Sequence, residues 1–267
     1  MAKLIFCDID GTLLDGSRNM NQISDKTRYA FKQLLKDNYV FIASGRCKGL
    51  LDKELLSLGL SGYVLCNGAY VEYDNKKIFS KCFDKDTLDK IKDITEKYNG
   101  FVIYETLNEM FVESLENETL GAFLGRWGKT VNGLKPGVDM NKDYHIIMNG
   151  FINEESKLKA GEELKEYVDL APHSSFSSYD INIKGINKGS GVIEAIKYLN
   201  VDINDTYCFA DGINDLEMLQ IVKHPVVMKN AINELKTYEF EETDDVLDDG
   251  FYNYLVSNKL IKPLWFC

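Results

Sequence analysis

The feature that most constrains the fold is a pair of carboxylates at the end of an apolar run near the N-terminus. The run Leu4 to Cys7 is followed directly by Asp8, Ile9, Asp10 and Gly11. A short run of large apolar residues closed by glycine is typical of a parallel strand that is covered on both faces. Ligands of open α/β sheets bind at the ends of such strands. We therefore expect an α/β chain with a functional site at Asp8 and Asp10.

These two carboxylates are suited to phosphate chemistry. An aspartate with a reference pKa of about 3.9 is ionised at neutral pH, so Asp8 can attack phosphorus directly and Asp10 can carry the proton. A calcium loop is excluded, because an EF-hand needs a third ligand, a glycine and a glutamate where this chain has Thr12, Leu13 and Asn19. A plain Asp/Gly turn after a strand is the simpler alternative.

Three further apolar runs end in polar residues. Residues 39–43 run into Ser44, Gly45 and Arg46, residues 63–66 run into Asn67 and Gly68, and residues 207–210 run into Asp211, Gly212, Ile213, Asn214 and Asp215. Any one of these junctions is weak evidence, because polar turns commonly follow strands. Four such junctions, two of them rich in carboxylates, favour a shared anion site.

This constellation resembles the haloacid dehalogenase superfamily of phosphohydrolases, and within it the Cof-type branch with a large α/β cap. The superfamily's four motifs are matched in turn by Asp8 to Thr12, by Ser44, by Lys188 and by Ala210 to Asp215. Ala210 stands where the family usually has glycine. Two segments resemble the Cof-type branch in particular, Asn67 to Ala69 and Val227 to Ala231.

The resemblance implies a Rossmann-like, doubly wound parallel sheet as the catalytic core, with an inserted α/β cap. Because two motifs precede residue 70 and two follow residue 185, we expect residues 1–82 and 184–267 to form the core and residues 83–183 the cap. Residues 69–80 favour a hairpin, and Leu88, Ile91 and Ile94 recur at helical spacing. We expect cap strands at 101–104, 110–113, 145–148 and 180–183 and a helix at 154–167. The acidic run 241–249 is typical of a solvated loop.

The resemblance also implies a magnesium ion and an aspartyl-phosphate. A phosphomonoester dianion about 3.5 Å from ionised Asp8 is repelled by roughly 9 kcal/mol at an effective dielectric near 20, so positive charge is needed. The implied metal ligands are the Asp8 carboxylate, the Asp10 main-chain carbonyl, Asp211 and Asp215. The implied catalytic residues are Asp8, Asp10 and Lys188. The implied phosphate- or substrate-binding residues are Gly11, Ser44, Gly45, Arg46, Asn67 and Asn214. Taken alone, Lys188 is typical of a surface lysine at the start of a helix.

Composition limits the partners. A formal net charge of −11 argues against nucleic acid or a membrane surface, because each requires an extended basic face. The six cysteines show neither a disulfide rhythm nor zinc spacing, no signal-peptide pattern is present and no apolar run reaches 18 residues, which predicts a reducing cytoplasm. We expect a monomer or a small homo-oligomer.

Substrate choice is expected to lie in the cap, since the core motifs recognise only phosphate. The resemblance implies small phosphorylated metabolites, such as sugar phosphates or cofactor phosphates, and the cap offers Arg126, Lys129, His145 and His173 as polar candidates. Two alternatives come from other classes. A sugar phosphomutase or phosphotransferase would use the same fold and nucleophile. A catalytically silent binding or regulatory protein is disfavoured by the intact set of acidic residues and Lys188.

Overall fold

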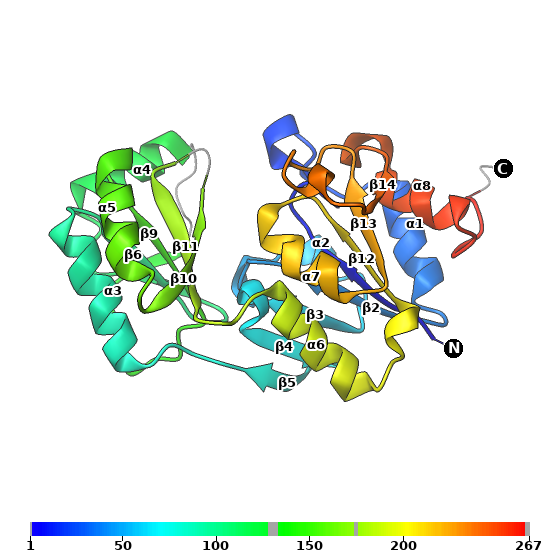
Figure 1. Ribbon diagram of the computed structural model, residues 1–267, viewed down its shortest axis with the longest axis horizontal. Helices are drawn as coiled ribbons and strands as arrows, with labels where there is room; N and C mark the ends of the chain where they lie inside the picture. The colour runs from blue at the N-terminus through cyan, green and yellow to red at the C-terminus, as the bar shows by residue number, and fades with distance from the viewer. Residues whose placement is uncertain (1, 128–132, 174–175, 265–267) are drawn as a thin grey trace. The chain divides into compact units, whose positions relative to one another are not determined.

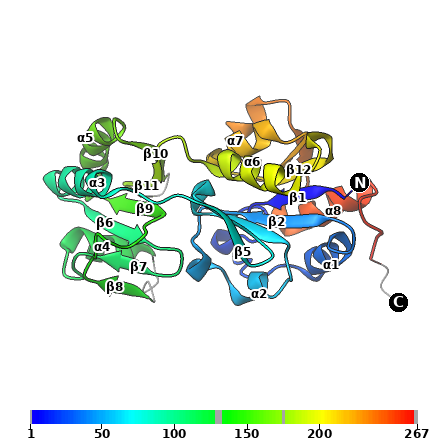
Figure 2. The same cartoon turned by 90° about the horizontal axis from the view of Figure 1, so that it is seen from below.

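A computed structural model of the chain describes residues 2–127, 133–173 and 176–264 (Figures 1 and 2). The chain forms two compact units. Unit 1 comprises Met1–Arg46, Leu51–Ser80 and Asn187–Cys267, and unit 2 comprises Cys47–Leu50 and Lys81–Ile186. Compared with the predicted domains, unit 2 also takes residues 81–82, 184–186 and 47–50. The functional division into core and cap stays a prediction.

Unit 1 contains an eight-stranded sheet with the order β14-β13-β12-β1-β2-β3-β4-β5. The strands from β14 to β3 are parallel, and β4 and β5 form an antiparallel hairpin at one edge. Central β1 is fully buried, as the unbroken apolar run predicts. The bounds are β1 Leu4–Cys7, β2 Tyr39–Ala43, β3 Gly62–Leu65, β4 Tyr70–Tyr73, β5 Lys76–Ser80, β12 Thr206–Ala210, β13 His224–Met228 and β14 Glu241–Thr243.

Helices cover both faces of this sheet, as Figure 1 shows. The helices are α1 Asp25–Leu34, α2 Lys53–Leu56, α6 Lys188–Leu199, α7 Leu216–Ile221 and α8 Gly250–Ser257. On one face, α6 and α7 contribute Val192 and Met218 to a core with Phe6 and Phe41. On the other face, the ring of Phe251 in α8 lies 5.1 Å from that of Phe31 in α1 and 4.8 Å from that of Phe209. The predicted doubly wound α/β core is confirmed.

Unit 2 contains a six-stranded sheet with the order β10-β11-β9-β6-β7-β8. Alternate residues of β6 face opposite sides: Val102 and Tyr104 pack with α3 and α5, whereas Phe101 and Ile103 pack with α4. The bounds are α3 Lys85–Lys97, β6 Phe101–Glu105, β7 Met110–Val112, α4 Glu118–Trp127, β8 Leu134–Pro136, β9 Ile146–Gly150, α5 Glu154–Leu164, β10 Val168–Pro172 and β11 Ser178–Ile183.

Several sequence expectations need correction. Strand β3 ends at Leu65 and not at Cys66, because Cys66 adopts a left-handed backbone with φ +52°. Helix α5 ends at Leu164 and not at residue 167, because strand β10 begins four residues later. The acidic run is not simply a solvated loop: Glu241–Thr243 forms edge strand β14 beside β13, and the short 3-10 helix η7 covers Val246–Asp248.

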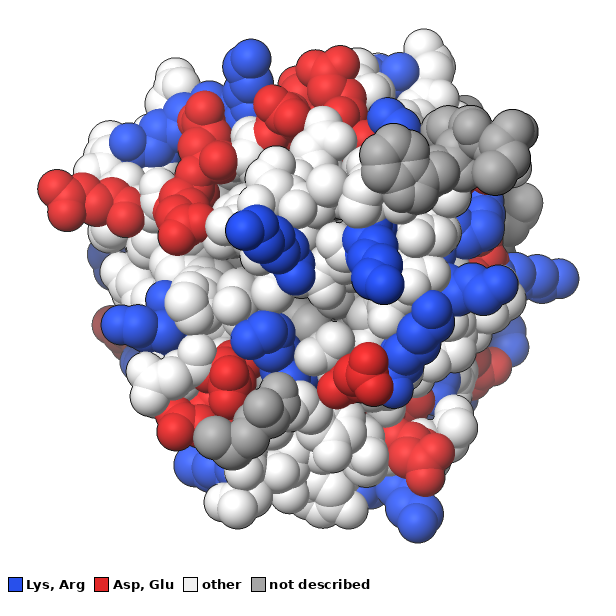
Figure 3. All heavy atoms as spheres, turned by 90° about the vertical axis from the view of Figure 1, so that its right-hand side faces the viewer, with Lys and Arg blue, Asp and Glu red and all other residues white. Residues whose placement is uncertain are grey.

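The charge and cysteine patterns can be followed in the same structure. Figure 3 shows the face on the right-hand side of Figure 1, where the coloured basic and acidic side chains are interspersed. None of the five cysteines within the described ranges forms a disulfide, and Cys7, Cys66 and Cys208 among them are buried. None of the helices in those ranges combines the length and the apolar character that a membrane crossing requires.

Candidate active site

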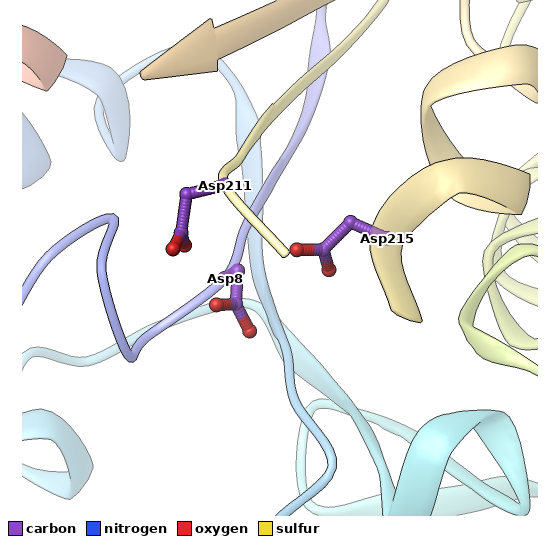
Figure 4. A group of neighbouring side chains, drawn as sticks. All are labelled: Asp8, Asp211 and Asp215. Carbon is purple, nitrogen blue, oxygen red and sulfur yellow. The ribbon is translucent and has the colours of Figure 1, made fainter. Parts of the chain in front are cut away.

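The candidate site lies in unit 1, where the carboxyl ends of neighbouring strands meet. Asp8 follows β1 and Asp211 follows β12, and these strands run parallel with Cys7 opposite Phe209. Asp215 ends the short turn Ile213–Asp215 before α7. Figure 4 shows the three carboxylates converging from these separate segments. One carboxylate oxygen from each residue lies within 4.8 Å of the other two.

Lys188 lies within this acidic cluster. Its Nζ donates to Asp8 Oδ1 at 2.6 Å and to Asp215 Oδ1 at 2.6 Å, and the residue is only 1% exposed. Lys188 is the first residue of α6, whose start is fixed by a capping box between Asn187 and Ser190. It is therefore a buried counter-ion and not a surface lysine.

Burial and charge shift the titration of this cluster. Burial raises the pKa of Asp8 to about 7 against the opposing effect of Lys188. Burial and then the charge of Asp8 raise the pKa of Asp211 to about 8. Burial alone would lower the pKa of Lys188, but Asp215 and Asp8 hold it above its ordinary value. Lys188 is hydrogen-bonded to only two of the three carboxylates, so the ionised cluster carries excess negative charge that a cation with oxygen ligands can balance.

Gly11 brings the loop after β1 against Asp211. Its φ is +89°, a conformation that side chains other than glycine rarely adopt, and a Cβ there would lie 2.0 Å from Asp211 Oδ2. The neighbouring hydroxyl of Thr12 donates to Asp211 Oδ1 at 3.0 Å. Glycine at this position therefore allows the loop carrying Asp10 to approach the acidic cluster.

The carboxylate of Asp10 lies in a different environment from that of Asp8. Arg46 donates two hydrogen bonds to the Asp10 carboxylate, from Nε to Oδ2 at 2.9 Å and from Nη2 to Oδ1 at 2.6 Å. Arg46 also donates to Asp52 at 3.2 Å. The Asp10 side chain is 59% exposed, against 9% for Asp8. The structure therefore brings the predicted proton carrier and the predicted phosphate-binding cation together as an ion pair.

The remaining predicted phosphate-binding residues lie along the same edge of the sheet. The buried Ser44 hydroxyl accepts from the Arg46 main-chain N–H at 3.2 Å. Asn67 adopts a left-handed backbone with φ +49°, and its Oδ1 accepts from Asn214 Nδ2 at 3.3 Å. A Cβ on Gly45 would lie 3.0 Å from the same Asn67 oxygen. Their roles toward phosphate stay predictions.

Three further residues of the site were not predicted as site residues from the sequence. Thr12 was named only as part of a motif, although its hydroxyl orients Asp211. Asp52 precedes α2 and shares Arg46 with Asp10. Asn230 donates to the Gly11 carbonyl oxygen at 2.7 Å. The available signal for Asn230 was its place in the branch-specific segment Val227 to Ala231.

The polar candidates of unit 2 serve mainly internal contacts where they are described. His145 is buried, with its Nε2 3.5 Å from Cys82 Sγ. His173 contacts Ser178 Oγ at 2.7 Å and Asp180 at 3.2 Å. Arg126 belongs to α4, and Lys129 lies outside the described residues.

Comparisons with known proteins identify the family of this chain. A family model described as haloacid dehalogenase-like hydrolase matches residues 5–255. "Putative phosphatase YkrA" of Bacillus subtilis (strain 168) is 30% identical over 93% of this chain and 95% of its own length. The 5-amino-6-(5-phospho-D-ribitylamino)uracil phosphatase YcsE of the same organism is 27% identical over 93% of this chain and 92% of its own.

A solved structure shows the same fold. BT1666 from Bacteroides thetaiotaomicron, a phosphatase of the haloalkanoate superfamily, has a TM-score of 0.85 at 24% identity, covering 98% of this chain and 96% of its own. At that identity the likeness concerns the fold alone. The family model spans nearly the whole chain, including the acidic cluster and Lys188. The chain therefore belongs to the haloacid dehalogenase-like hydrolases.

Proposed function

We propose that this protein is a phosphatase that hydrolyses small phosphorylated metabolites through an aspartyl-phosphate on Asp8. The observation that carries the proposal is the buried cluster of Asp8, Asp211 and Asp215 with the ammonium of Lys188 between two of them. Such a cluster costs free energy unless cations compensate it, so its presence at the edge of the sheet where ligands bind indicates a function.

A divalent cation fits the donor set. The carboxylates of Asp8, Asp211 and Asp215 and the main-chain carbonyl of Asp10 supply oxygen ligands, which Mg²⁺ prefers. When bound, the ion would neutralise charge on the phosphate and on the carboxylates around it. The raised pKa values of Asp8 and Asp211 support this assignment, because they indicate that the protein alone provides too little positive charge to balance these buried carboxylates.

Asp8 is the nucleophile in this proposal. A carboxylate oxygen forms the new bond to phosphorus while the bond from phosphorus to the leaving oxygen breaks. Lys188 holds Oδ1 of Asp8 at 2.6 Å, which fixes the carboxylate and reduces its repulsion of the incoming dianion. Phosphoryl transfer needs mainly positioning and charge neutralisation, and Lys188 contributes to both at Asp8.

Asp10 carries the proton, and Arg46 controls when it is available. Asp10 would protonate the leaving oxygen and then deprotonate the water that attacks phosphorus, releasing phosphate and restoring Asp8. Both carboxylate oxygens of Asp10 are bound to Arg46 in this structure. We infer that Arg46 exchanges Asp10 for a phosphate oxygen when substrate binds, since a guanidinium binds carboxylate and phosphate with the same fork geometry.

The substrate class follows from the relatives and from the site. YcsE is named for a phosphorylated ribityl compound, and the full-length match to it supports a phosphate ester of a polyol or sugar. The cluster of three carboxylates supports a substrate whose phosphate lies at the metal.

A phosphate-release screen tests the proposal. Sugar, polyol, nucleotide and cofactor monophosphates would be incubated with the protein, with and without MgCl₂, beside the Asp8→Asn variant. We expect release that depends on Mg²⁺ and on Asp8. Isomer formation with a sugar bisphosphate primer, in place of free phosphate, would indicate a phosphomutase. No turnover of any substrate by the wild-type protein would contradict an enzymatic role.

A further inference from the structure

Asn230 joins two segments that are far apart in the sequence. It follows β13, and its Nδ2 donates to the Gly11 carbonyl oxygen at 2.7 Å. Its Oδ1 accepts from the Val246 main-chain N–H at 2.9 Å. The amide is thus used at both ends, one on the loop of residues 8–14 and one on η7. Two residues later, the Ile232 N–H donates to the Asp211 carbonyl oxygen at 3.1 Å, so this turn also contacts the second acidic loop.

Gly11 is the point at which a displacement would affect the site most. It follows Asp10 directly, and the space where a Cβ would stand is occupied by the Asp211 carboxylate. Thr12, on its other side, donates to that carboxylate. A shift of the Gly11 peptide would therefore move the proposed proton carrier and a proposed metal ligand together.

The anchor at Val246 is itself well fixed. Val246 is 3% exposed, and its neighbour Asp245 accepts from Arg18 at 2.9 Å. Arg18 in turn donates to Asp15 at 2.6 Å, beyond the far end of the 8–14 loop. The segment 245–246 therefore braces the chain between residues 8 and 18 at two points, through Asn230 and through Arg18. A polar hollow of about 600 Å³ lies beside this brace, with Asp10, Gly11, Asp211 and Asn230 in its wall.

We propose that Asn230 is a positioning residue for the hydrolysis, which holds the Gly11 carbonyl so that Asp10 and Asp211 keep their productive arrangement. The proposal rests on the function proposed above. Asn230 acts through the 8–14 loop and not on the substrate, so its loss should lower turnover more than substrate affinity. Misplacing reacting groups by about 1 Å can cost up to about 10²-fold in rate.

Two variants and a matched control isolate this role. Asn230→Ala removes both hydrogen bonds. Asn230→Asp keeps the volume and the acceptor for Val246 but removes the donor to Gly11. The control is Asn253→Ala, because Asn253 is also half-buried and its amide donates to Asp244 and to the Asp248 carbonyl at 2.7 and 2.8 Å, within the same C-terminal segment. The readouts are kcat and KM for p-nitrophenyl phosphate with MgCl₂, and hydrogen exchange of peptides covering residues 8–14.

We expect kcat to fall by about 10- to 100-fold in both Asn230 variants, with KM within about threefold of wild type and faster exchange across residues 8–14. The control should stay within about twofold in kcat. Equal effects of Asn230→Ala and Asn253→Ala, or a change in KM alone, would overturn the proposal. Failure of both Asn230 variants to fold would also count against it, because Asn230 would then be a folding residue. A wild-type protein without phosphatase activity would refute the proposed function instead, and the exchange data would still decide whether Asn230 holds the loop.

Discussion

In unit 1 the buried carboxylates of Asp8 and Asp215 both accept hydrogen bonds from the ammonium of Lys188. In unit 2, by contrast, the partly buried carboxyl of Glu105 accepts a hydrogen bond from the Cys47 thiol. Burial and then the charge of Asp180 raise the pKa of Glu105 to about 8. Burial also raises the pKa of Cys47 to about 12, so the thiol remains a neutral partner.

The difference shows two ways to compensate a carboxyl group that is removed from water. Glu105 can keep its proton, because a neutral carboxylic acid needs only a hydrogen-bond partner. Asp8 is instead held beside a fixed cation, which favours the ionised form that a nucleophile needs. The following predictions test whether the ionised carboxylates of unit 1 serve chemistry while the protonated carboxyl of unit 2 serves only the fold.

The largest effect should come from Asp8→Asn. An amide is a poor nucleophile and a weak metal ligand, so we expect turnover to fall by at least about 10⁴-fold. The fold should survive, because the amide fills the same volume beside Lys188. Phosphate release and thermal unfolding would be measured on the same preparation. Turnover within tenfold of wild type would remove Asp8 from the nucleophile role.

The next effect concerns the cation. Asp211→Ala, or excess chelator with the wild-type protein, should lower turnover by at least about 10³-fold, since the repulsion between substrate and carboxylates is then uncompensated. The exposed Asp202 offers a matched control, because Asp202→Ala removes a carboxylate from unit 1 away from the cluster. Full activity in chelator would show that Lys188 alone balances the charge. Titration of activity with Mg²⁺ measures the difference.

Asp10→Ala should have a smaller effect that depends on the substrate. General acid-base catalysis typically contributes about 10²- to 10⁴-fold, and a good leaving group needs less protonation. Formation of the aspartyl-phosphate from p-nitrophenyl phosphate should therefore be slowed less than its formation from a sugar phosphate. Rapid-quench measurements with both substrates compare the two losses. Equal slowing would remove Asp10 from the acid role.

Much of unit 1 could be predicted because its strands are short apolar runs that stop at glycine-rich polar junctions. Strands β1, β2 and β12 and the start of α6 are found where those runs and motifs place them. Strand β14 could not be predicted in this way, because Glu241 and Glu242 lie exposed at the edge of the sheet and give no alternation of apolar residues. Strand β14 pairs with β13 through main-chain hydrogen bonds, which leave no pattern of side chains in the sequence.

The side-chain pairings of the site were equally out of reach. The composition and the motifs predicted Arg46 as a cation for phosphate, but its grip on Asp10 joins residues 36 positions apart whose distance is set by the sheet register. The hydrogen bonds of Asn230 join residues 219 and 16 positions apart. Motifs indicate which residues act, whereas such long-range contacts depend on how the loops pack.

The smallest predicted effect lies in unit 2 and concerns Glu105. A pKa raised from 4.5 to about 8 means that the folded protein binds a proton that the unfolded chain has released. The free energy of unfolding should therefore decrease as the pH rises from about 4.5 to about 8, with the full contribution present below the lower value.

Glu105→Gln keeps a neutral group of similar shape and removes this titration. Between pH 5.5 and pH 8.5 we expect the decrease in wild type to exceed that in the variant by about 3 kcal/mol. Urea unfolding of both proteins at pH 5.5 and pH 8.5 measures it. If both proteins lose the same stability, the pKa of Glu105 is not raised, and the contrast between Glu105, compensated by its own proton, and Asp8, compensated by Lys188, fails. If phosphatase activity is also unchanged in Glu105→Gln, the protonated carboxyl of unit 2 is separable from the chemistry of unit 1.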